Sequence, residues 1–400
     1  MMLRMLTVAL CSLVWLTSPA CAQPEPTEKS NDEPATEADV PKTPEEEARK
    51  EDVDILSQER RRATVITPLA AVRAFPVSLN VALRGGVQWI VNPPRARDDV
   101  FGFGAADVVV TARPTPQITL LVDVEGLIGQ GPDQALDTLS RVNADADRLE
   151  GRDRKLKLRE AWVRVQSSDG TIRFNVGKLD VTHYFDRNFF AEDETRQFLN
   201  GALTGNPMLR EPPNSAAAAI RVSQGDWRYA LGVHAPDEIT GSMSGLPFFV
   251  GELGHRDIFP LSGHYRWWAR FGSVPERRSD VTWGTGWSFD QLVTANTGAF
   301  FRAGLSRSEG EHVTSYAWST GLQHSPDWLG RPKDLAGAGY TFQRESPGRE
   351  RAAEVYYNIS LAQCCQLITN VEWIFSGPDQ KTGRRRHDIV VPGIRALILY

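Results

Sequence analysis

Two neighbouring stretches, HYRWWARF (residues 264–271) and VTWGTGWSF (residues 281–289), decide the fold class of this chain. In both, residues of one parity are apolar, and residues of the other parity are mostly polar, charged or glycine. A period of two sends successive side chains to opposite faces of a β-strand. We therefore predict strands that have one apolar and one polar face.

The same alternation recurs along the chain, in QITLLVDVE (117–125), WRYALGVH (227–234) and EVYYNISL (354–361). Ten further candidate strands lie near 81–91, 105–113, 156–166, 171–178, 216–222, 298–305, 314–322, 335–343, 366–375 and 389–400. Residues 65–79 or 246–253 could supply another. At ~20 residues for each strand and connector, the body holds about 16 strands, an even number as bacterial barrels require. In LKLREAWVRV the apolar parity slips between Leu158 and Ala161, which predicts a β-bulge.

Two architectures are built from many alternating strands: a soluble β-sandwich and a transmembrane barrel. Three features favour the barrel. The strands run to roughly 8–11 residues, the length of a tilted membrane strand. Charged residues recur on the second face, which a dry core could not hold without partners. Aromatic residues lie near strand ends on the apolar face, as at a membrane interface: Trp227, Tyr229, Trp283, Trp287, Tyr316 and Trp318.

The two ends of the chain suit an exported barrel. Residues 1–22 combine Arg4, an apolar run and the small residues Ala20 and Ala22, which predicts a signal peptide cleaved after Ala22. A lipidated Cys21 is the weaker alternative. Residues 23–62 are acidic and poor in aromatics, which predicts a mostly disordered periplasmic linker. Residues 63–400 form the barrel, which closes with GIRALILY and a terminal aromatic, Tyr400.

Charge and cysteine content exclude several classes of function. The chain carries −5 in total. Residues 1–22 contribute +1, and residues 23–62 contribute −6 from 13 acids and 7 bases, so the body is neutral. This argues against a nucleic-acid partner and suits an uncharged one. The adjacent Cys364 and Cys365 lack the spacing of a metal site, and they are either free or a strained vicinal disulfide. We expect neither metal nor cofactor.

A polar stretch follows one of the predicted strands: FNVGKLDVTHYFDRNFFAEDETRQFLNGALTGNP (174–207). This stretch resembles the carbohydrate-selective porin family of the bacterial outer membrane (OprB type). EVYYNISL, QLITNVEWIFSGP (366–378) and VPGIRALILY (391–400) are similar to its last strands, whereas residues 235–350 match only in general pattern. The resemblance implies a 16-stranded barrel in the outer membrane that lets sugars diffuse across. Whether it works as a monomer or a homotrimer stays open.

The stretch FDRNFFAEDETRQFLN (185–200) is too polar for a wall facing lipid. Structured polar backbone at membrane depth occurs only inside protein or beside water. We therefore predict that the chain leaves the wall at Gly177 and folds into the lumen, with a helical turn over residues 193–199 that ends at Asn200-Gly201. Its four phenylalanines, Phe185, Phe189, Phe190 and Phe198, are assigned to packing more than to a sugar track.

Candidate functional residues follow from this placement. The predicted constriction or solute contacts are Asp180, His183, Tyr184, Asp186, Arg187, Asn188, Asp193, Glu194, Arg196, Gln197 and Asn200. The predicted pore wall is Arg173, Arg221, Arg228, His264, Arg266, Arg270, Glu354 and Asn358. Carboxylates and amides meet sugar hydroxyls, and the arginines keep the lumen near neutral. The wall residues equally suit a solvated lining with ion pairs between strands.

Two other functions remain as alternatives. Asp186 with Glu192 or Glu194 could form an acid–base pair of the kind glycosidases use, but the sequence gives no separation between these carboxylates. A barrel that conducts nothing could instead serve as a scaffold or attachment protein through its acidic tail. Such a barrel would lose its function on deletion of residues 23–62, whereas a pore would change on editing residues 178–200.

Overall fold

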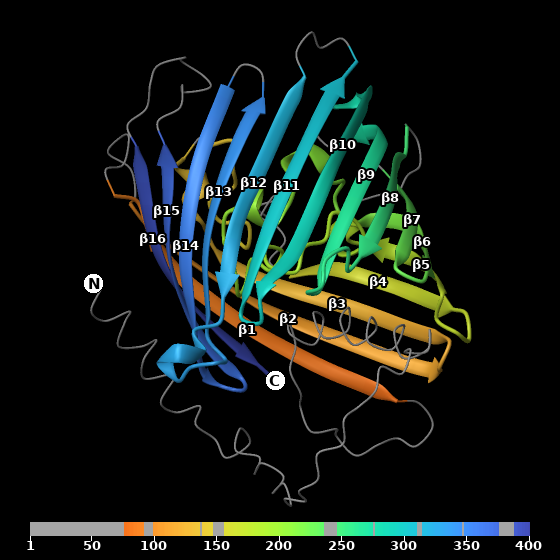
Figure 1. The fold of residues 1–400 in the computed structure, drawn as a ribbon, viewed down its shortest axis with the longest axis horizontal. Helices are drawn as coiled ribbons and strands as arrows, with labels where there is room; N and C mark the ends of the chain where they lie inside the picture. The colour runs from red at the N-terminus through yellow and green to blue at the C-terminus, as the bar shows by residue number, and fades with distance from the viewer. Residues whose placement is uncertain are drawn as a thin grey trace, which may run out of the picture.

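In the computed structural model, the described residues are 76–91, 99–136, 138–146, 156–235, 246–274, 277–309, 314–345, 348–375 and 388–400. They form sixteen strands that close into one barrel (Figure 1). The strands are β1 (Val77–Trp89), β2 (Val100–Thr115), β3 (Ile118–Gly129), β4 (Leu156–Gln166), β5 (Ile172–Leu179), β6 (Ser215–Gln224), β7 (Trp227–His234), β8 (Phe248–Arg256), β9 (Gly263–Val274), β10 (Arg277–Thr294), β11 (Thr297–Ser308), β12 (Ser315–His324), β13 (Leu335–Glu345), β14 (Gly348–Ala362), β15 (Cys365–Phe375) and β16 (Ile389–Leu399).

Each strand pairs antiparallel with its sequence neighbours, and β1 pairs with β16 to close the ring. The predicted all-β transmembrane barrel with about 16 strands is confirmed. The last residue takes part in the closure, because Tyr400 and Val81 exchange two backbone hydrogen bonds of 2.8 and 3.0 Å. Of the two stretches that could supply the sixteenth strand, residues 246–253 do so, as β8. The predicted signal peptide and linker, residues 1–62, lie outside the described residues.

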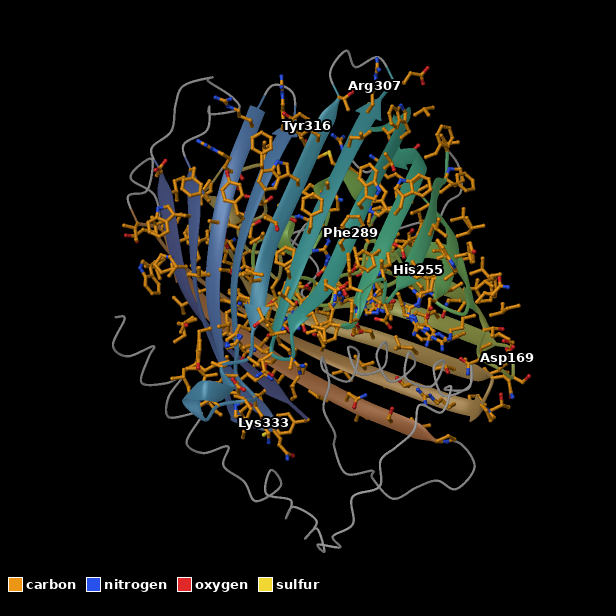
Figure 2. The ribbon with its side chains drawn as sticks, viewed as in Figure 1. Asp169, His255, Phe289, Arg307, Tyr316 and Lys333 are labelled. Carbon is orange, nitrogen blue, oxygen red and sulfur yellow. The ribbon has the colours of Figure 1, made fainter. Side chains whose placement is uncertain are left out.

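The two rims of the barrel differ in the length of their connections. Two-residue turns join β2 to β3, β6 to β7, β10 to β11 and β14 to β15 at one rim. The longest connections, such as those after β3 and β5, lie at the other rim, although the connection of residues 325–334 between β12 and β13 lies at the first rim. Figure 2 shows Arg307 toward the long-connection rim and Lys333 toward the short-turn rim. In bacterial outer-membrane barrels short turns face the periplasm, which places the C-terminus and Cys364 on that side.

The two faces of the wall follow the predicted parity. On β9 and β10, Trp267 and Trp287 are cross-strand partners, and both point outward and are exposed. The predicted interface aromatics lie on this outer face, and Trp318 stacks there on the ring of Phe342. Inward positions such as Arg266 and Arg270 are buried. The bulge in β4 is also confirmed: the β3–β4 register shifts beside Arg159.

Four short 3-10 helices and one α-helix complete the described structure. They are η2 (Pro132–Gln134), η4 (Val181–His183), α3 (Gly201–Thr204), η5 (Pro207–Leu209) and η6 (Asp327–Leu329). No helix in the described part of the chain is long and apolar enough to cross a membrane. Three of the five, η4, α3 and η5, lie in the connection between β5 and β6, so most of the helical structure gathers where the chain leaves the wall.

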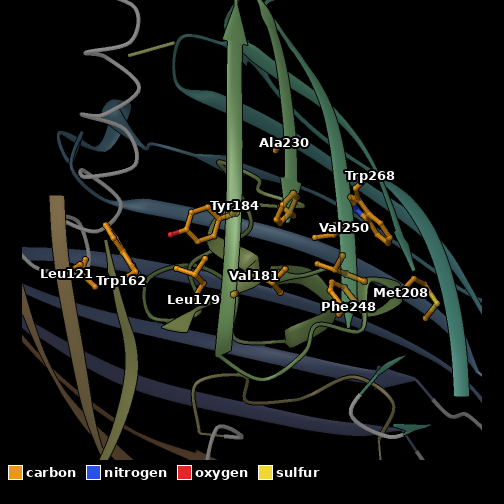
Figure 3. Packing of buried hydrophobic residues seen from close by; sticks show 14 of the residues in the cluster. Leu121, Trp162, Leu179, Val181, Tyr184, Met208, Ala230, Phe248, Val250 and Trp268 are labelled. Carbon is orange, nitrogen blue, oxygen red and sulfur yellow. The ribbon is translucent and has the colours of Figure 1, made fainter. Parts of the chain in front are cut away.

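Apolar packing occurs inside the barrel as well as on its outer face. One cluster joins Tyr184, Phe185 and Met208 of the β5–β6 connection to Phe248 and Trp268 of the wall (Figure 3). A second cluster brings Phe190, Phe198 and Leu203 of the same connection against Phe300 and Tyr356. The lumen is therefore partly filled by a packed core, which alternation along single strands does not predict.

Candidate functional site

One connection turns inward. β5 ends at Leu179 and β6 begins at Ser215, and these two residues are register partners. The chain between them, residues 180–214, leaves the wall and returns to it at the same height; its yellow-green trace lies inside the ring of strands (Figure 1). We call it the inward segment. The predicted exit at Gly177 is two residues too early, because Gly177 still pairs with β6.

The helical structure of the inward segment differs from the prediction over residues 193–199. The carbonyl of Asp193 accepts from the N–H of Gln197 at 2.8 Å, which makes a single turn. The α-helix starts only at Gly201, because Asn200 caps it: its Oδ1 accepts from the second N–H of the helix at 3.0 Å. Asn200 therefore begins the helix that it was expected to end.

Arg302 on β11 holds the inward segment at three points. Its Nη1 donates to the carbonyls of Ala191, at 2.5 Å, and Leu203, at 2.8 Å. Its Nη2 donates to the carbonyl of Asp186 at 3.2 Å, and its Nε lies 3.0 Å from the Asp186 carboxylate. The Arg302 side chain is 1 % exposed. A planar guanidinium with five donors suits such a junction. One side chain thus donates hydrogen bonds to carbonyls of the segment that no neighbouring strand reaches.

Three residues of β14 and β16 hold the middle of the segment, residues 194–200. The carboxylate of Glu354 accepts from the backbone N–H groups of Leu199 and Asn200, each at 2.9 Å. Arg395 donates to the carbonyl of Gln197 at 2.8 Å and also to that of Glu194. Asn358 donates to the backbone carbonyl of Arg196 at 3.0 Å. Two of the predicted wall residues, Glu354 and Asn358, thus bind the segment's backbone.

Two predicted wall arginines of β9 also bind the backbone of the inward segment. Arg266 donates to the carbonyl of Arg187 at 2.8 Å and to the Asp290 carboxylate at 2.8 Å. Arg270 donates to the carbonyl of Met208 at 3.0 Å. Both guanidinium groups face the lumen as predicted, and both are buried against the inward segment. Buried backbone carbonyls need such donors, so these arginines brace the loop.

Glycines at inward positions of the wall make room for side chains of the segment. A Cβ on Gly298 would lie 2.0 Å from the ring of Phe190, and a Cβ on Gly232 would lie 2.8 Å from the ring of Phe185. A Cβ on Gly304 would meet Asn206 at 2.7 Å. Because no larger residue fits at these close approaches, the wall and the segment are complementary in shape.

The predicted constriction residues divide into two groups. Tyr184, Asp186, Asn188, Glu194, Arg196, Gln197 and Asn200 are buried between the segment and the wall. Asp180, His183, Arg187 and Asp193 are half-buried, together with Glu192 and Thr195, which were not on the predicted list. Arg187 pairs with Glu192 at 3.2 Å, and His183 lies 2.7 Å from Glu160. The half-buried group is the polar surface that the segment presents to the lumen.

Asp186 is constrained both by its backbone conformation and by its side-chain partners. Its φ of 56° lies in the left-handed region, where a residue other than glycine is uncommon. Its carboxylate accepts from the indole N–H of Trp268 at 2.8 Å, and its own N–H donates to Glu252 at 2.8 Å. Burial raises the pKa of its carboxyl to about 7, against the opposing effects of Arg302 and Trp268. Such a site immobilises the residue, and it does not present an acid to a solute.

A second charged network, which the sequence reasoning missed, covers the wall of β1 to β4. Arg84 lies 2.7 Å from Asp145 and 2.5 Å from Glu125, and it also pairs with Asp107. Arg159 at the bulge lies 3.7 Å from Glu125. Alternation along each strand could have placed Arg84, Asp107 and Glu125 in the lumen. The same is true of Arg302 and Arg395. Alternation could not have given the partners of these residues, because the partners depend on which strands are neighbours.

The remaining wall predictions also point inward. Arg173 and Arg221 face each other across β5 and β6, Arg228 follows on β7, and His264 lies 2.6 Å from Asp290. The adjacent Cys364 and Cys365 are half-buried thiols with sulfur atoms 3.3 Å apart. Among the described residues, no group of three or more His, Cys, Asp or Glu could hold a metal ion.

Comparison with known proteins gives one family match. Residues 262–399, which span β9 to β16, match the family model described as carbohydrate-selective porin, OprB family. No curated protein is similar enough in sequence to count as a relative.

Solved structures establish the fold. The high-pH structure of Pseudomonas putida OprB matches with a TM-score of 0.64 at 14% identity, over 80% of this chain and 94% of that one. The outer-membrane channel DcaP of Acinetobacter baumannii matches with a TM-score of 0.55 at 12% identity, over 83% of this chain and 99% of that one. The anion-selective porin of Comamonas acidovorans matches with a TM-score of 0.51 at 9% identity, over 82% and 100%. Over residues 262–399 the chain is therefore similar to the carbohydrate-selective porins of the OprB family, and its closed barrel with a braced inward segment has the fold of the outer-membrane channels named above.

Proposed function

We propose that small carbohydrates cross this barrel by passive diffusion, and that the inward segment forms the constriction they pass. The observation that carries the proposal is the bracing of residues 180–214. Arg302, Arg395 and Glu354 bind its backbone from three different strands. A loop held in this way keeps one shape at its free edge, and a filter for neutral solutes needs a fixed aperture and fixed polar groups.

The half-buried group of the segment supplies the solute contacts in this proposal. Asp180, His183, Arg187 and Asp193 offer both donors and acceptors to sugar hydroxyls. Their charges are largely paired within the protein, as in the Arg187–Glu192 contact of 3.2 Å, so the aperture stays near neutral. Several weak contacts serve transport better than one tight site, because the solute must leave again. The buried group sets the shape of the aperture.

Export and assembly complete the proposal. Residues 1–22 direct the chain out of the cytoplasm and are removed after Ala22, and residues 23–62 form a periplasmic linker before the barrel. Outer-membrane lipid surrounds the apolar face. Vibrio cholerae OmpT, a barrel of similar fold, has been solved in a trimer form, so a homotrimer and a monomer are both considered. Sedimentation of the refolded chain in detergent distinguishes them.

The test is single-channel conductance of the refolded mature chain in a planar bilayer, with a neutral sugar titrated in. Discrete current steps that the sugar reduces in a saturable way are expected. Steps that ignore sugar would leave a pore without a sugar preference. The absence of steps from a folded barrel would favour the scaffold alternative, which deletion of residues 23–62 then tests.

A further inference from the structure

The connection between β8 and β9, residues 257–262 (DIFPLS), presents large apolar side chains at the short-turn rim. We call it the apolar loop. Ile258, Phe259 and Leu261 are 56%, 57% and 41% exposed. The turns on either side of it, residues 225–226 and 295–296, carry no large apolar side chain. Apolar side chains gathered at a rim are unfavourable in water, so this group calls for a partner.

The apolar loop is closed at its base. The N–H of Asp257 donates to the carbonyl of Gly263 at 2.8 Å, and the carboxylate of Asp257 accepts from the N–H of Gly263 at 2.9 Å. The φ of Asp257 is 53°, in the left-handed region, which redirects the chain at the end of β8. The N–H of Leu292 on β10 donates to the carbonyl of Ser262 at 2.9 Å. These bonds give the loop a defined shape.

Gln291 holds the apolar loop against the outer face of the barrel, because it lies at an outward position of β10. Its Nε2 donates to the carbonyls of Leu261, at 2.8 Å, and Ser262, at 3.4 Å, and its Oε1 accepts from the hydroxyl of Tyr265. A Cβ on Gly263 would lie 2.2 Å from this Oε1, so a glycine there leaves room for the amide. The polar groups of Gln291 are thus used within the protein, as a surface beside lipid requires.

The ring of Phe259 joins the apolar loop to the wall that faces lipid. Its centroid lies 6.1 Å from that of Tyr265, which points outward on β9. The ring of Tyr265 lies 5.7 Å from that of Phe289, and Phe289 stacks on Phe301 at 6.1 Å. A continuous row of rings therefore runs from the loop onto the outer face of β9 to β11. Aromatic residues gather where the apolar band of a barrel meets the headgroups, so this row indicates a membrane boundary beside the loop.

We propose that the apolar loop inserts into the periplasmic leaflet of the membrane and anchors this side of the barrel to phospholipid. Ile258, Phe259 and Leu261 then lie between the headgroups and the acyl chains, where binding grows with the apolar area that is buried. The inference rests on the membrane placement in the proposed function and is independent of the sugar. A second barrel is the competing occupant. The continuity of the rings with the lipid-facing wall favours lipid.

The experiment places one nitroxide spin label on the refolded mature chain in phospholipid vesicles. Replacing Cys364 and Cys365 by serine leaves no other thiol in residues 23–400. Oxygen concentrates in lipid and a nickel chelate stays in water, so the ratio of their collision rates with the label reports its surroundings. With both agents on both sides of the membrane, a label at Phe259→Cys should give an oxygen-to-nickel ratio several times that of Ser168→Cys. Ser168 is the matched control, exposed in a polar turn of the same rim, and Figure 2 shows Asp169 of that turn.

Gln291→Leu tests whether this side chain holds the loop in the membrane. In this variant the ratio of the Phe259→Cys label should fall toward the Ser168→Cys value, because two loop carbonyls lose their donor. Thr285→Val is the matched control, since it removes a hydroxyl at another outward position of β10 that donates to the wall and not to the loop. It should leave the ratio unchanged. An equal ratio in the two variants would refute the role assigned to Gln291.

A label at Leu231→Cys reports the membrane placement by itself, because Leu231 is 64% exposed on the outer face of β7. If this label is in lipid and the Phe259→Cys label is in water, the inference is overturned and the proposed membrane channel stands. Shielding of the Phe259→Cys label from both agents, with spectral broadening by a second label, would also overturn it in favour of a contact between barrels. If the Leu231→Cys label is itself in water, the membrane placement in the proposed function fails.

Discussion

The inward segment meets two different walls. Toward β9 to β16 its backbone is held by Arg266, Arg302, Arg395 and Glu354, and its phenylalanines fill spaces left by glycines such as Gly298. Toward β4 to β7 the arginines lie beside a small cavity, and Arg221 donates a long bond of 3.4 Å to the carbonyl of Tyr184. Lumen arginines of the same type thus have two kinds of surroundings. On the first wall they bind the segment's backbone carbonyls at short distances, and on the second wall their contact with the segment is longer.

The largest expected effect comes from removing the main brace. Arg302→Met keeps an unbranched apolar stem but removes the guanidinium group, and it leaves the Asp186 carboxylate buried without its ion-pair partner at 3.0 Å. We expect a loss of about 3–5 kcal/mol in the stability of the docked segment. Thermal unfolding in detergent and single-channel conductance measure it, with a lower midpoint and larger, noisier current steps.

The control for this variant is Arg307→Met on the same strand, where the side chain is exposed near the long-connection rim (Figure 2). It should leave both the unfolding midpoint and the conductance unchanged. Equal effects of the two substitutions would mean that Arg302 is not a brace.

A smaller effect is expected from closing one glycine space. The Cβ of Gly298→Ala would lie 2.0 Å from the ring of Phe190, so the ring must move. Overpacking of this kind costs about 1–3 kcal/mol. Protease sensitivity of the segment and conductance both report the change.

Gly102→Ala is the matched control, because its Cβ would find no atom nearer than 3.9 Å. The double variant Gly298→Ala with Phe190→Leu should recover part of the loss, since the smaller side chain vacates the space. A Gly298→Ala barrel that behaves like wild type would show that the segment does not pack where the structure has it.

The cavity side should tolerate a comparable charge removal. Arg221→Gln weakens the long hydrogen bond of 3.4 Å to the Tyr184 carbonyl and removes a charge that interacts with Glu252, so the stability of the docked segment should fall by only about 1 kcal/mol. If Arg221→Gln loosened the segment as much as Arg302→Met, the difference between the two walls would disappear.

The smallest effect concerns pH. The pKa of Asp186 is raised to about 7 by burial, above the ordinary value of about 3.9. The docked segment therefore binds the proton more tightly than the released one, and docking is favoured as pH falls. From about pH 7.5 to about pH 6.5 the gain is about 0.7 kcal/mol, because a group with a pKa of about 7 is on average half protonated over this range. Current noise should decrease slightly on acidification, and Asp186→Asn should abolish the trend. A rise in current noise on acidification that Asp186→Asn also abolishes would show that protonation of Asp186 weakens docking, contrary to this prediction.

The barrel could be predicted from sequence because its signal is local. Alternation within HYRWWARF or GIRALILY reports which face each residue takes, and this depends only on the strand itself. Parity therefore placed Arg266, Arg270 and Glu354 in the lumen, and the aromatic end of the chain indicated the closure at Tyr400. The slip of parity in β4 likewise predicted the bulge beside Arg159.

The inward segment could be predicted to exist but not to dock as it does. Its polarity excluded a wall facing lipid, yet the helix boundary at Asn200 was misplaced, because an N-cap and a C-terminal stop can use the same residue type. The bonds that hold it join residues far apart in the chain, such as Arg395 to Gln197 and Arg302 to Leu203. Nothing in the local pattern encodes such pairs.

By itself, the sequence determined that this chain is a membrane barrel, which residues face lipid, and that one polar segment must lie inside. Only the tertiary structure decided which lumen charges brace that segment and which remain beside a cavity. The physical reason is that the face a side chain takes depends on the two-residue period of its own strand. The residue that it contacts across the lumen is set only when sixteen strands have closed and fixed the distances between them.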